Sequence, residues 1–154
     1  MSSGNRIIEA FRSKGYKATP QRIAIANTVL NSKEHPSAET VYEEVKQVYP
    51  TLSMSTVYNT LHVLRDLDLV NELAFHDNTR YDPNTEIHAN LVCERCRKIT
   101  DLEDAELKEF VKRVSKKKGF TVTGHRLDIY GLCRDCARAH THKAYTEYNG
   151  STLG

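Results

Sequence analysis

Residues 91–99, LVCERCRKI, and residues 131–139, GLCRDCARA, each contain one C-x-x-C motif. All four cysteines of the 154-residue chain lie in these motifs: Cys93, Cys96, Cys133 and Cys136. In a reducing compartment this spacing predicts a zinc site, because each C-x-x-C turn supplies two thiolates and zinc takes four ligands in a tetrahedron. Four sulfur ligands leave no position open for water or substrate, so the predicted zinc is structural and not catalytic.

Two other interpretations compete with zinc. A redox-active C-x-x-C pair would leave the second motif without a role, and four free thiols are rarely grouped in this way. Basic residues beside the motifs would offset the charge of a four-thiolate centre: Arg95, Arg97, Lys98 and Arg134. A structural zinc contributes on the order of 10 kcal/mol to folding, and residues 85–140 need such a contribution because a module of this size buries only a modest core.

The composition, with 39% hydrophobic and 27% charged residues, is ordinary for a globular protein. No apolar run reaches the roughly 18 residues of a membrane span, and residues 1–17 are too polar for a secretory signal. We therefore expect a cytoplasmic protein without membrane attachment, whose thiols stay reduced. Residues 1–33 carry mostly basic charges, which suits either a phosphate-binding face or an ordinary solvated surface.

The first half reads as helices within residues 5–14, 19–32, 35–50 and 52–70. Thr19, Ser37 and Ser53 are the predicted N-caps, and Pro20 suits the first helical position. Apolar residues recur at helical spacing and form the predicted core. They are Ile7, Ile8, Phe11, Ile23, Ala26, Val29, Leu30, Val41, Val45, Val48, Met54, Val57, Leu61 and Leu64.

Two short strands, within residues 69–75 and 79–83, follow these helices. Helices followed by a hairpin are typical of a winged helix-turn-helix, whose last helix enters the major groove of DNA. The outward residues of that helix are small or uncharged, which favours base recognition over the alternative of an ordinary surface helix in an all-α core. They are Ser55, Thr56, Asn59 and His62, with Tyr58 at the border.

The second half is predicted to be α+β with three strands. Residues 87–93 and 98–102 are the first two strands, and residues 120–133 form a long third strand with a bulge at Gly124–His125. A helix over residues 102–119 is expected to turn Leu107, Phe110, Val111 and Val114 inward. Exposed sheet edges predict self-association, and the tail after Lys143 is expected to be mobile.

These segments in this order resemble the ferric uptake regulator (Fur) family of metal-dependent repressors, over roughly residues 5–137. The motifs that carry the resemblance are TPQR (19–22), HPSAETVY (35–42), STVYNTL (55–61), RYD (80–82), ITDL (99–102), HRLDIYG (125–131) and the two C-x-x-C pairs. Asn59 and Asp101 are most similar to the peroxide-responsive branch, PerR. Asp68 stands where the family tends to have glycine before the wing.

The resemblance implies a homodimer with a winged-helix DNA-binding domain, residues 1–84, and a dimerisation and metal-binding domain, residues 85–154. It implies a second, regulatory Fe2+ or Mn2+ ion, with Zn2+ as an alternative, and double-stranded palindromic DNA as the partner. The implied regulatory ligands are His35, Asp82, His88, Asn90 and Asp101. The implied DNA-binding residues are Lys17, Thr19, Gln21, Arg22, Ser55, Thr56, Tyr58 and Asn59.

One departure concerns the regulatory ligands. The family usually has H-x-H at positions 88 and 90, whereas this chain has Asn90, so an amide oxygen is the expected donor unless the site is four-coordinate or His76 substitutes. Without the resemblance, His35 could be a polar residue before a helix, Asp82 and Asp101 could cap a turn and a helix, and His88 could be a strand residue. His125 is expected to pack, and His140 and His142 to lie on the surface.

The expected function is therefore a transcriptional repressor that senses peroxide through its regulatory metal. The alternative within the family is an iron, manganese or zinc uptake regulator without peroxide sensing. A metal-dependent enzyme is a rival from another class, but no nucleophile–base pair is evident in the sequence. A zinc-containing protein-interaction module is a second rival.

Overall fold

The computed structural model describes residues 3–75 and 78–139. The chain divides between Glu86 and Ile87 into two compact units, here unit 1 and unit 2, and each is described by itself. The expectations for His76, for His140 and His142, and for the tail after Lys143 concern positions outside these ranges. Within these ranges no helix has the length and apolar character that crossing a membrane requires.

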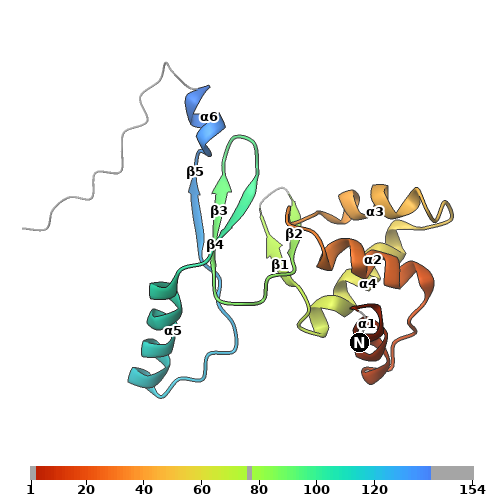
Figure 1. Ribbon diagram of the computed structural model, residues 1–154, viewed down its shortest axis with the longest axis horizontal. Coiled ribbons are helices and arrows are strands. Elements are labelled where there is room, and N and C mark those ends of the chain that lie inside the picture. Colours follow the sequence, from red (N-terminus) through yellow and green to blue (C-terminus); the bar gives the residue numbers. More distant parts are fainter. Residues whose placement is uncertain (1–2, 76–77, 140–154) are drawn as a thin grey trace, which may run out of the picture. The chain divides into compact units, whose positions relative to one another are not determined.

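The four predicted helices of unit 1 are present; three begin directly after their predicted N-caps, whereas the first begins at Ser3, two residues before the predicted range. They are α1 (Ser3–Ser13), α2 (Pro20–Leu30), α3 (Ala38–Lys46) and α4 (Met54–Asp66) (Figure 1). The side chains of Thr19, Ser37 and Ser53 each accept a hydrogen bond from the backbone N–H three residues later, which confirms the three predicted N-caps. These caps satisfy amide groups that the first turn of a helix leaves without a carbonyl partner.

The hairpin of unit 1 consists of β1 (Asn71–Ala74) and β2 (Thr79–Asp82), paired antiparallel. Tyr81, on β2, is buried in the helical core, so the unit has the winged-helix arrangement. Asp68 precedes the hairpin with a φ of 55°. This left-handed conformation explains a glycine preference at this position, and aspartate is one of the few other residues that adopt it readily.

The core of unit 1 lies between α1, α2, α3 and α4, with β2 against α2 and α3. The largest fully buried apolar side chains include Phe11, Ile25, Leu61 and Leu64. The prediction for Val48 is wrong, since it is 74% exposed; α3 ends at Lys46, so helical spacing no longer applies there.

The core stripe of α2 also differs from the prediction. Ile25 is fully buried, whereas the predicted Ile23 and Leu30 are half-buried. Helix α2 contacts α1, α3, α4 and β2, so more than one of its faces is covered. A helix that is enclosed in this way lacks the single apolar stripe on which a periodicity argument depends.

Unit 2 contains β3 (Ala89–Cys93), β4 (Ile99–Leu102), α5 (Ala105–Lys118), β5 (Asp128–Gly131) and α6 (Arg134–Arg138). Its sheet has the order β4-β3-β5, with β4 antiparallel and β5 parallel to β3. The three predicted strands and the α+β class are confirmed. Asp104 caps α5 by accepting from the backbone N–H groups of Glu106 and Leu107.

The predicted long third strand is wrong before Asp128, because β5 covers only Asp128–Gly131. The Asn90 N–H still donates to the Leu127 carbonyl at 2.8 Å, but the His88 N–H donates to the His125 Nε2 atom at 3.2 Å. An imidazole thus occupies the place that a backbone carbonyl would take in a continued ladder. Regular pairing stops at Asp128, so Gly124–His125, where the sequence predicts a bulge, lies outside the strand.

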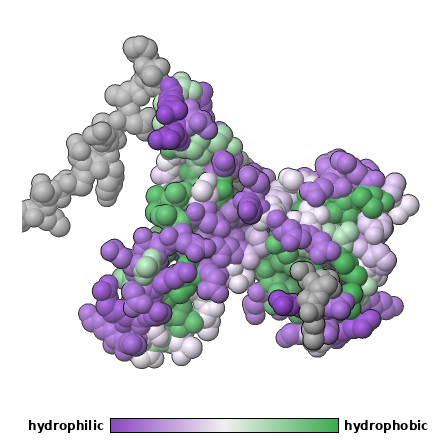
Figure 2. All heavy atoms as spheres, viewed as in Figure 1, coloured by the Kyte–Doolittle hydropathy of each residue, from purple (hydrophilic) through white to green (hydrophobic). Residues whose placement is uncertain are grey.

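The predicted inward face of α5 is wrong for two of its four residues, since Leu107 and Val111 are half-buried but the other two are exposed. Phe110 is 52% exposed and Val114 is 36% exposed. Figure 1 shows α5 beyond one end of the strands of unit 2 and not across the face of their sheet. Ile129 and Tyr130, on β5, are exposed as well, and Figure 2 shows hydrophobic surface over this part of the unit.

We predict that Leu61→Ala will reduce the free energy of unfolding of unit 1 by about 2–5 kcal/mol. Leu61 is fully buried on α4, and its truncation removes apolar contacts and leaves a cavity. Urea denaturation monitored by helical circular dichroism measures the loss. The control, Val48→Ala, should change stability by no more than about 0.5 kcal/mol; equal effects of the two substitutions would contradict this description of the core.

Candidate metal centres and nucleic-acid interface

The two C-x-x-C motifs come together in unit 2. One ligand atom from each of Cys93, Cys96, Cys133 and Cys136 lies within 4.8 Å of all the others. The Sγ atoms of Cys96 and Cys133 are 3.8 Å apart, which is about the edge of a tetrahedron with zinc–sulfur bonds of about 2.3 Å. This geometry fits a structural zinc site.

Local backbone structure positions the sulfurs. Cys93 ends β3, and the turn after it closes through a 2.9 Å hydrogen bond from the Arg97 N–H to the Cys93 carbonyl. Arg97 takes a left-handed φ of 62°, which returns the chain to β4. Cys133 lies at the N-cap of α6, so Cys136 follows one turn later.

The pKa values of two of the thiols, Cys93 and Cys136, shift in opposite directions. The Cys133 N–H donates to Cys93 Sγ at 3.4 Å, and this donor, with the Cys96 N–H, lowers the pKa of Cys93 to about 6. The neighbouring Cys133 sulfur raises the pKa of Cys136 to about 12. Four sulfurs this close cannot all ionise without a cation among them, which is the situation that a divalent metal relieves.

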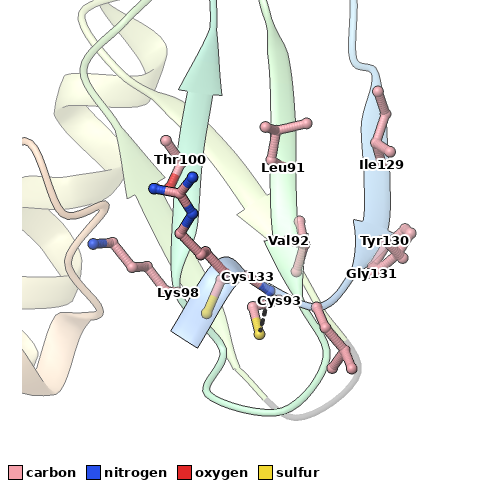
Figure 3. Close-up of a pocket in the computed structure, with 11 residues that line it drawn as sticks. Leu91, Val92, Cys93, Lys98, Thr100, Ile129, Tyr130, Gly131 and Cys133 are labelled. Carbon is pink, nitrogen blue, oxygen red and sulfur yellow. Dashed lines mark hydrogen bonds between the residues drawn. The ribbon is translucent and has the colours of Figure 1, made fainter. Parts of the chain in front are cut away.

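An apolar groove of about 430 Å³ lies next to the cysteine cluster, along the sheet of unit 2. Figure 3 shows Leu91 and Ile129 side by side on β3 and β5, with Cys93 and Cys133 at one end. Leu91 is 37% exposed and Ile129 is 47% exposed. An antiparallel or mixed sheet normally covers one face with apolar contacts, so this face lacks a covering element within the described part of the chain.

Unit 1 contains one buried histidine beside a carboxylate. His35 Nε2 lies 3.4 Å from Asp82 Oδ1, and the two side chains are 3% and 1% exposed. Asp82 ends β2, and Arg80 on the same strand donates from Nη1 to the His35 carbonyl at 3.2 Å. The Tyr81 N–H donates to the Pro36 carbonyl, so β2 positions both members of the pair.

The backbone of His35 is in a rare conformation. Its φ is 47°, in the left-handed region, which costs a non-glycine residue on the order of 1 kcal/mol. Such strain is concentrated at functional sites. Asp82 Oδ1 also accepts a hydrogen bond from the Asn84 N–H at 2.7 Å. Asp82 therefore caps the turn after β2, as the alternative interpretation expects, and also lies beside His35.

Unit 2 contains a similar pair. His88 Nε2 lies 3.9 Å from Asp101 Oδ1, with His88 2% and Asp101 29% exposed. Asn90, 3% exposed, is the register partner of Asp101 on the adjacent strand. His125 packs edge-to-face on His88 with ring centroids 5.9 Å apart, as expected for a packing role.

The sequence gives little indication of one further polar residue here, Asp128. Asn90 Nδ2 donates to Asp128 Oδ1 at 3.0 Å, because the two residues face each other across β3 and β5. A carboxylate in an otherwise apolar strand, LDIYG, is the signal from which this role could have been suspected.

The predicted DNA-binding residues lie at the N-terminal parts of α2 and α4. Five of them are exposed and three are half-buried; the exposed ones are Lys17, Thr19, Ser55, Tyr58 and Asn59, and the half-buried ones are Gln21, Arg22 and Thr56. Several already make hydrogen bonds: Thr19 caps α2, Arg22 Nη1 donates to the Lys17 carbonyl, Gln21 Nε2 donates to Thr51 Oγ1, and Thr56 pairs with Ser53.

Tyr58 connects α4 to α3. Its hydroxyl donates to Glu39 Oε1 at 3.0 Å, and this contact raises the pKa of the Tyr58 phenol. Glu39 lies in the first turn of α3, where backbone N–H donors lower the pKa of its carboxyl. The carboxylate therefore stays charged beside the hydroxyl on this surface.

Relatives of known function resemble the chain over most of its length. The peroxide-responsive repressor PerR of Staphylococcus aureus (strain USA300) is 38% identical over 130 residues, which cover 84% of this chain and 88% of that protein. The Campylobacter jejuni peroxide stress regulator has a solved structure with a TM-score of 0.69 and 33% identity, covering 88% of this chain and 100% of that one.

The ferric uptake regulator Fur of Helicobacter pylori, whose structure reveals three functional metal binding sites, has a TM-score of 0.74 at 24% identity and covers 86% of this chain and 90% of that one. At this identity the likeness concerns the fold alone. The model of the ferric uptake regulator family matches residues 13–130. With that match and the 38% identity to PerR, the chain belongs to the ferric uptake regulator family, whose members are transcriptional regulators.

Proposed function

We propose that this protein is a dimeric, metal-dependent transcriptional repressor that senses peroxide through a regulatory Fe2+ or Mn2+ ion. In this proposal residues 1–84 bind a palindromic operator and residues 85–154 dimerise. The observation that carries it is that each unit holds a buried histidine beside a carboxylate, His35 with Asp82 and His88 with Asp101. Buried polar groups of this kind are costly unless they serve a ligand or a partner.

The donor set fits a divalent ion. Imidazole and carboxylate ligands suit Fe2+, Mn2+ or Zn2+ better than a thiolate-seeking ion. Asn90 adds an amide oxygen, Oδ1, which is buried and has no hydrogen-bond partner among the described residues. The residues that would hold the ion are His35, Asp82, His88, Asn90 and Asp101.

Ligands from both units give the ion its regulatory role. When bound, it would restrict the angle between the DNA-binding arms of a dimer, so that the two α4 helices reach successive major grooves. A nearly complete shift between two arrangements requires about 5.5 kcal/mol of differential affinity, which a transition metal with several protein ligands can supply.

Peroxide sensing is supported by the similarity to PerR of S. aureus and depends on oxidisable ligands. An Fe2+ ion held by these residues would activate peroxide for reaction beside it. One peroxide oxygen would then be inserted into a ring C–H bond of His35 or His88 and the other would leave as water, so that the modified imidazole is lost as a ligand and the operator is released. Asn90 favours the alternative of an uptake regulator without peroxide sensing, because it replaces one imidazole by an amide.

Dimerisation is supported by the incomplete core of unit 2. Several apolar side chains on β3, α5 and β5 are exposed, namely Leu91, Phe110, Val114, Ile129 and Tyr130. A second copy of the chain would cover the groove shown in Figure 3, and closed two-fold symmetry is the commonest arrangement for such a contact. The same symmetry suits a palindromic operator.

DNA binding is assigned to the N-terminal parts of α2 and α4. Lys17 and Arg22 would contact phosphates, together with Thr19 and Gln21. Tyr58 and Asn59 would lie nearest the bases, with Ser55 and Thr56 beside them. This division follows the general rule that charged groups fix position on the duplex and groove-facing polar groups read sequence.

We predict one equivalent of zinc per chain, lost in Cys96→Ser. Removing the ion costs unit 2 on the order of 10 kcal/mol, so its sheet should unfold while the helices of unit 1 remain. Elemental analysis and circular dichroism measure both effects. Zinc must displace thiol protons, so its apparent affinity should fall as the pH is lowered. Full zinc content in Cys96→Ser would contradict the assignment.

We predict that binding to the operator requires a divalent ion and is reversed by a chelator. Asp101→Asn should weaken DNA binding at fixed Mn2+ by about tenfold or more, because it removes a charged ligand. Gel shift measures this. The control Glu103→Gln makes the same charge change at an exposed side chain and should have little effect. Chelator-insensitive retention would contradict metal dependence.

We predict that peroxide adds oxygen to the peptide containing His35 or His88 when the protein carries Fe2+, and not when it carries Mn2+. Mass spectrometry of the digested protein identifies the modified residue, and gel shift measures the accompanying loss of DNA binding. Absence of added oxygen on both peptides, with metal-dependent DNA binding retained, would favour the uptake-regulator alternative.

A further inference from the structure

Three polar side chains lie in a row across one face of the unit 2 sheet. Asn90 is on the central strand β3, and its register partners are Asp101 on β4 and Asp128 on β5. Residues that are directly opposite on neighbouring strands point to the same face. Asn90 is therefore between two carboxylates, one assigned to the proposed regulatory site and one not.

The hydrogen bond to Asp128 determines which way the amide of Asn90 faces. Asn90 Nδ2 donates to Asp128 Oδ1 at 3.0 Å. An ionised carboxylate only accepts hydrogen bonds, so the NH2 group must face Asp128 and the oxygen must face the opposite side of the planar amide. That oxygen is buried and has no hydrogen-bond partner among the described residues. A bound cation would satisfy it, since a buried acceptor left without any partner is unfavourable.

Asp128 is itself held in place by hydrogen bonds. Arg126 Nε donates to its Oδ2 atom at 2.8 Å, and Arg126 Nη2 forms an ion pair with the same atom at 2.8 Å. The Tyr130 hydroxyl donates to this oxygen as well, at 3.4 Å. These donors leave the Oδ1 atom to Asn90. The carboxylate is 11% exposed, so water competes little for it.

We infer that Asp128 is a positioning residue that turns the amide oxygen of Asn90 toward the regulatory metal, so that this oxygen replaces the imidazole expected at position 90. The inference rests on the proposed function, because it requires a metal near His88 and Asp101. Asp128 does not bind the ion in this scheme. It acts only through Asn90, as outer hydrogen-bond partners of metal ligands generally do.

Asp128→Asn tests the inference because it keeps the shape and reverses the hydrogen bond. Arg126 requires the oxygen of the introduced amide, so the introduced NH2 group faces Asn90 and inverts the Asn90 amide. We expect Mn2+ affinity to fall by about 10–100-fold, with Mn2+ as probe because amide oxygens suit it. The paramagnetic resonance signal of free Mn2+ reports binding in the full-length, zinc-loaded protein. Asp66→Asn, at an exposed position, controls for the charge change.

Variants at position 90 separate positioning from a structural role. In an Asn90→Ala background, Asp128→Asn should change Mn2+ affinity by no more than about twofold, the additivity error for independent sites. The exchange Asn90→Asp with Asp128→Asn restores the pairing with donor and acceptor swapped, and should recover binding. Asp128→Asn alone could lose zinc or helical signal, in which case the exchanged variant decides. Recovery of Mn2+ binding in the exchanged variant supports the positioning role. Failure to recover it, in an exchanged variant that is folded and zinc-loaded, overturns that role.

The failures are distinguishable through His88→Ala. If His88→Ala loses Mn2+ binding while Asp128→Asn does not, or if the effect of Asp128→Asn persists in the Asn90→Ala background, the positioning role is overturned and the proposed regulatory site stands. If His88→Ala binds Mn2+ like the unaltered protein, the regulatory site itself is wrong.

Discussion

The closely spaced sulfurs of unit 2 are the constraint on which the remainder of that unit depends. They join the end of β3, the turn after it and the start of α6. Few apolar side chains of the unit are buried, and those of α5 and β5 are largely exposed. A small unit with so little buried apolar surface needs a cross-link, a metal or a second chain for stability. The sulfur cluster fits a structural zinc site, and the exposed sheet face is the surface that a second chain would cover in the proposed dimer.

Unit 1 couples its buried histidine to the surface assigned to DNA. β2 carries Asp82 and holds the His35–Pro36 backbone through hydrogen bonds. Ser37, next in the chain, caps α3, and Glu39 in the first turn of α3 accepts the Tyr58 hydroxyl of α4. A continuous set of backbone and side-chain contacts therefore leads from the proposed metal ligands of unit 1 to α4, the helix proposed to contact DNA.

Local chemistry made much of the fold predictable from the sequence. Caps at Thr19, Ser37 and Ser53 depend on neighbouring residues only, and paired cysteines have few roles in a reduced protein. What failed depends on tertiary context. Whether Phe110 is covered depends on what packs against α5, and the length of β5 depends on an imidazole from His125 taking the place of a backbone carbonyl in the ladder.

The residues of the candidate site also fall into a part that the sequence predicts and a part that it does not. Short motifs carried the resemblance that supplied the histidine and aspartate ligands, and the structure brings them together as a pair in each unit. Asp128 was missed because its role depends on a parallel strand pairing between residues that are far apart in sequence, and no local pattern encodes that register.

The sequence separation between the two C-x-x-C motifs has a consequence for the order of events during synthesis. Cys93 is made 40 residues before Cys133, and at about 5–20 residues per second the later thiols emerge roughly 2–8 s after the first. In that interval the early pair can hold an ion only through two sulfurs, open to exchange with cellular thiols. The four-sulfur site is therefore complete only late in translation. A shortage of zinc would leave unit 2 of the newly made chain without its metal, and so unable to fold.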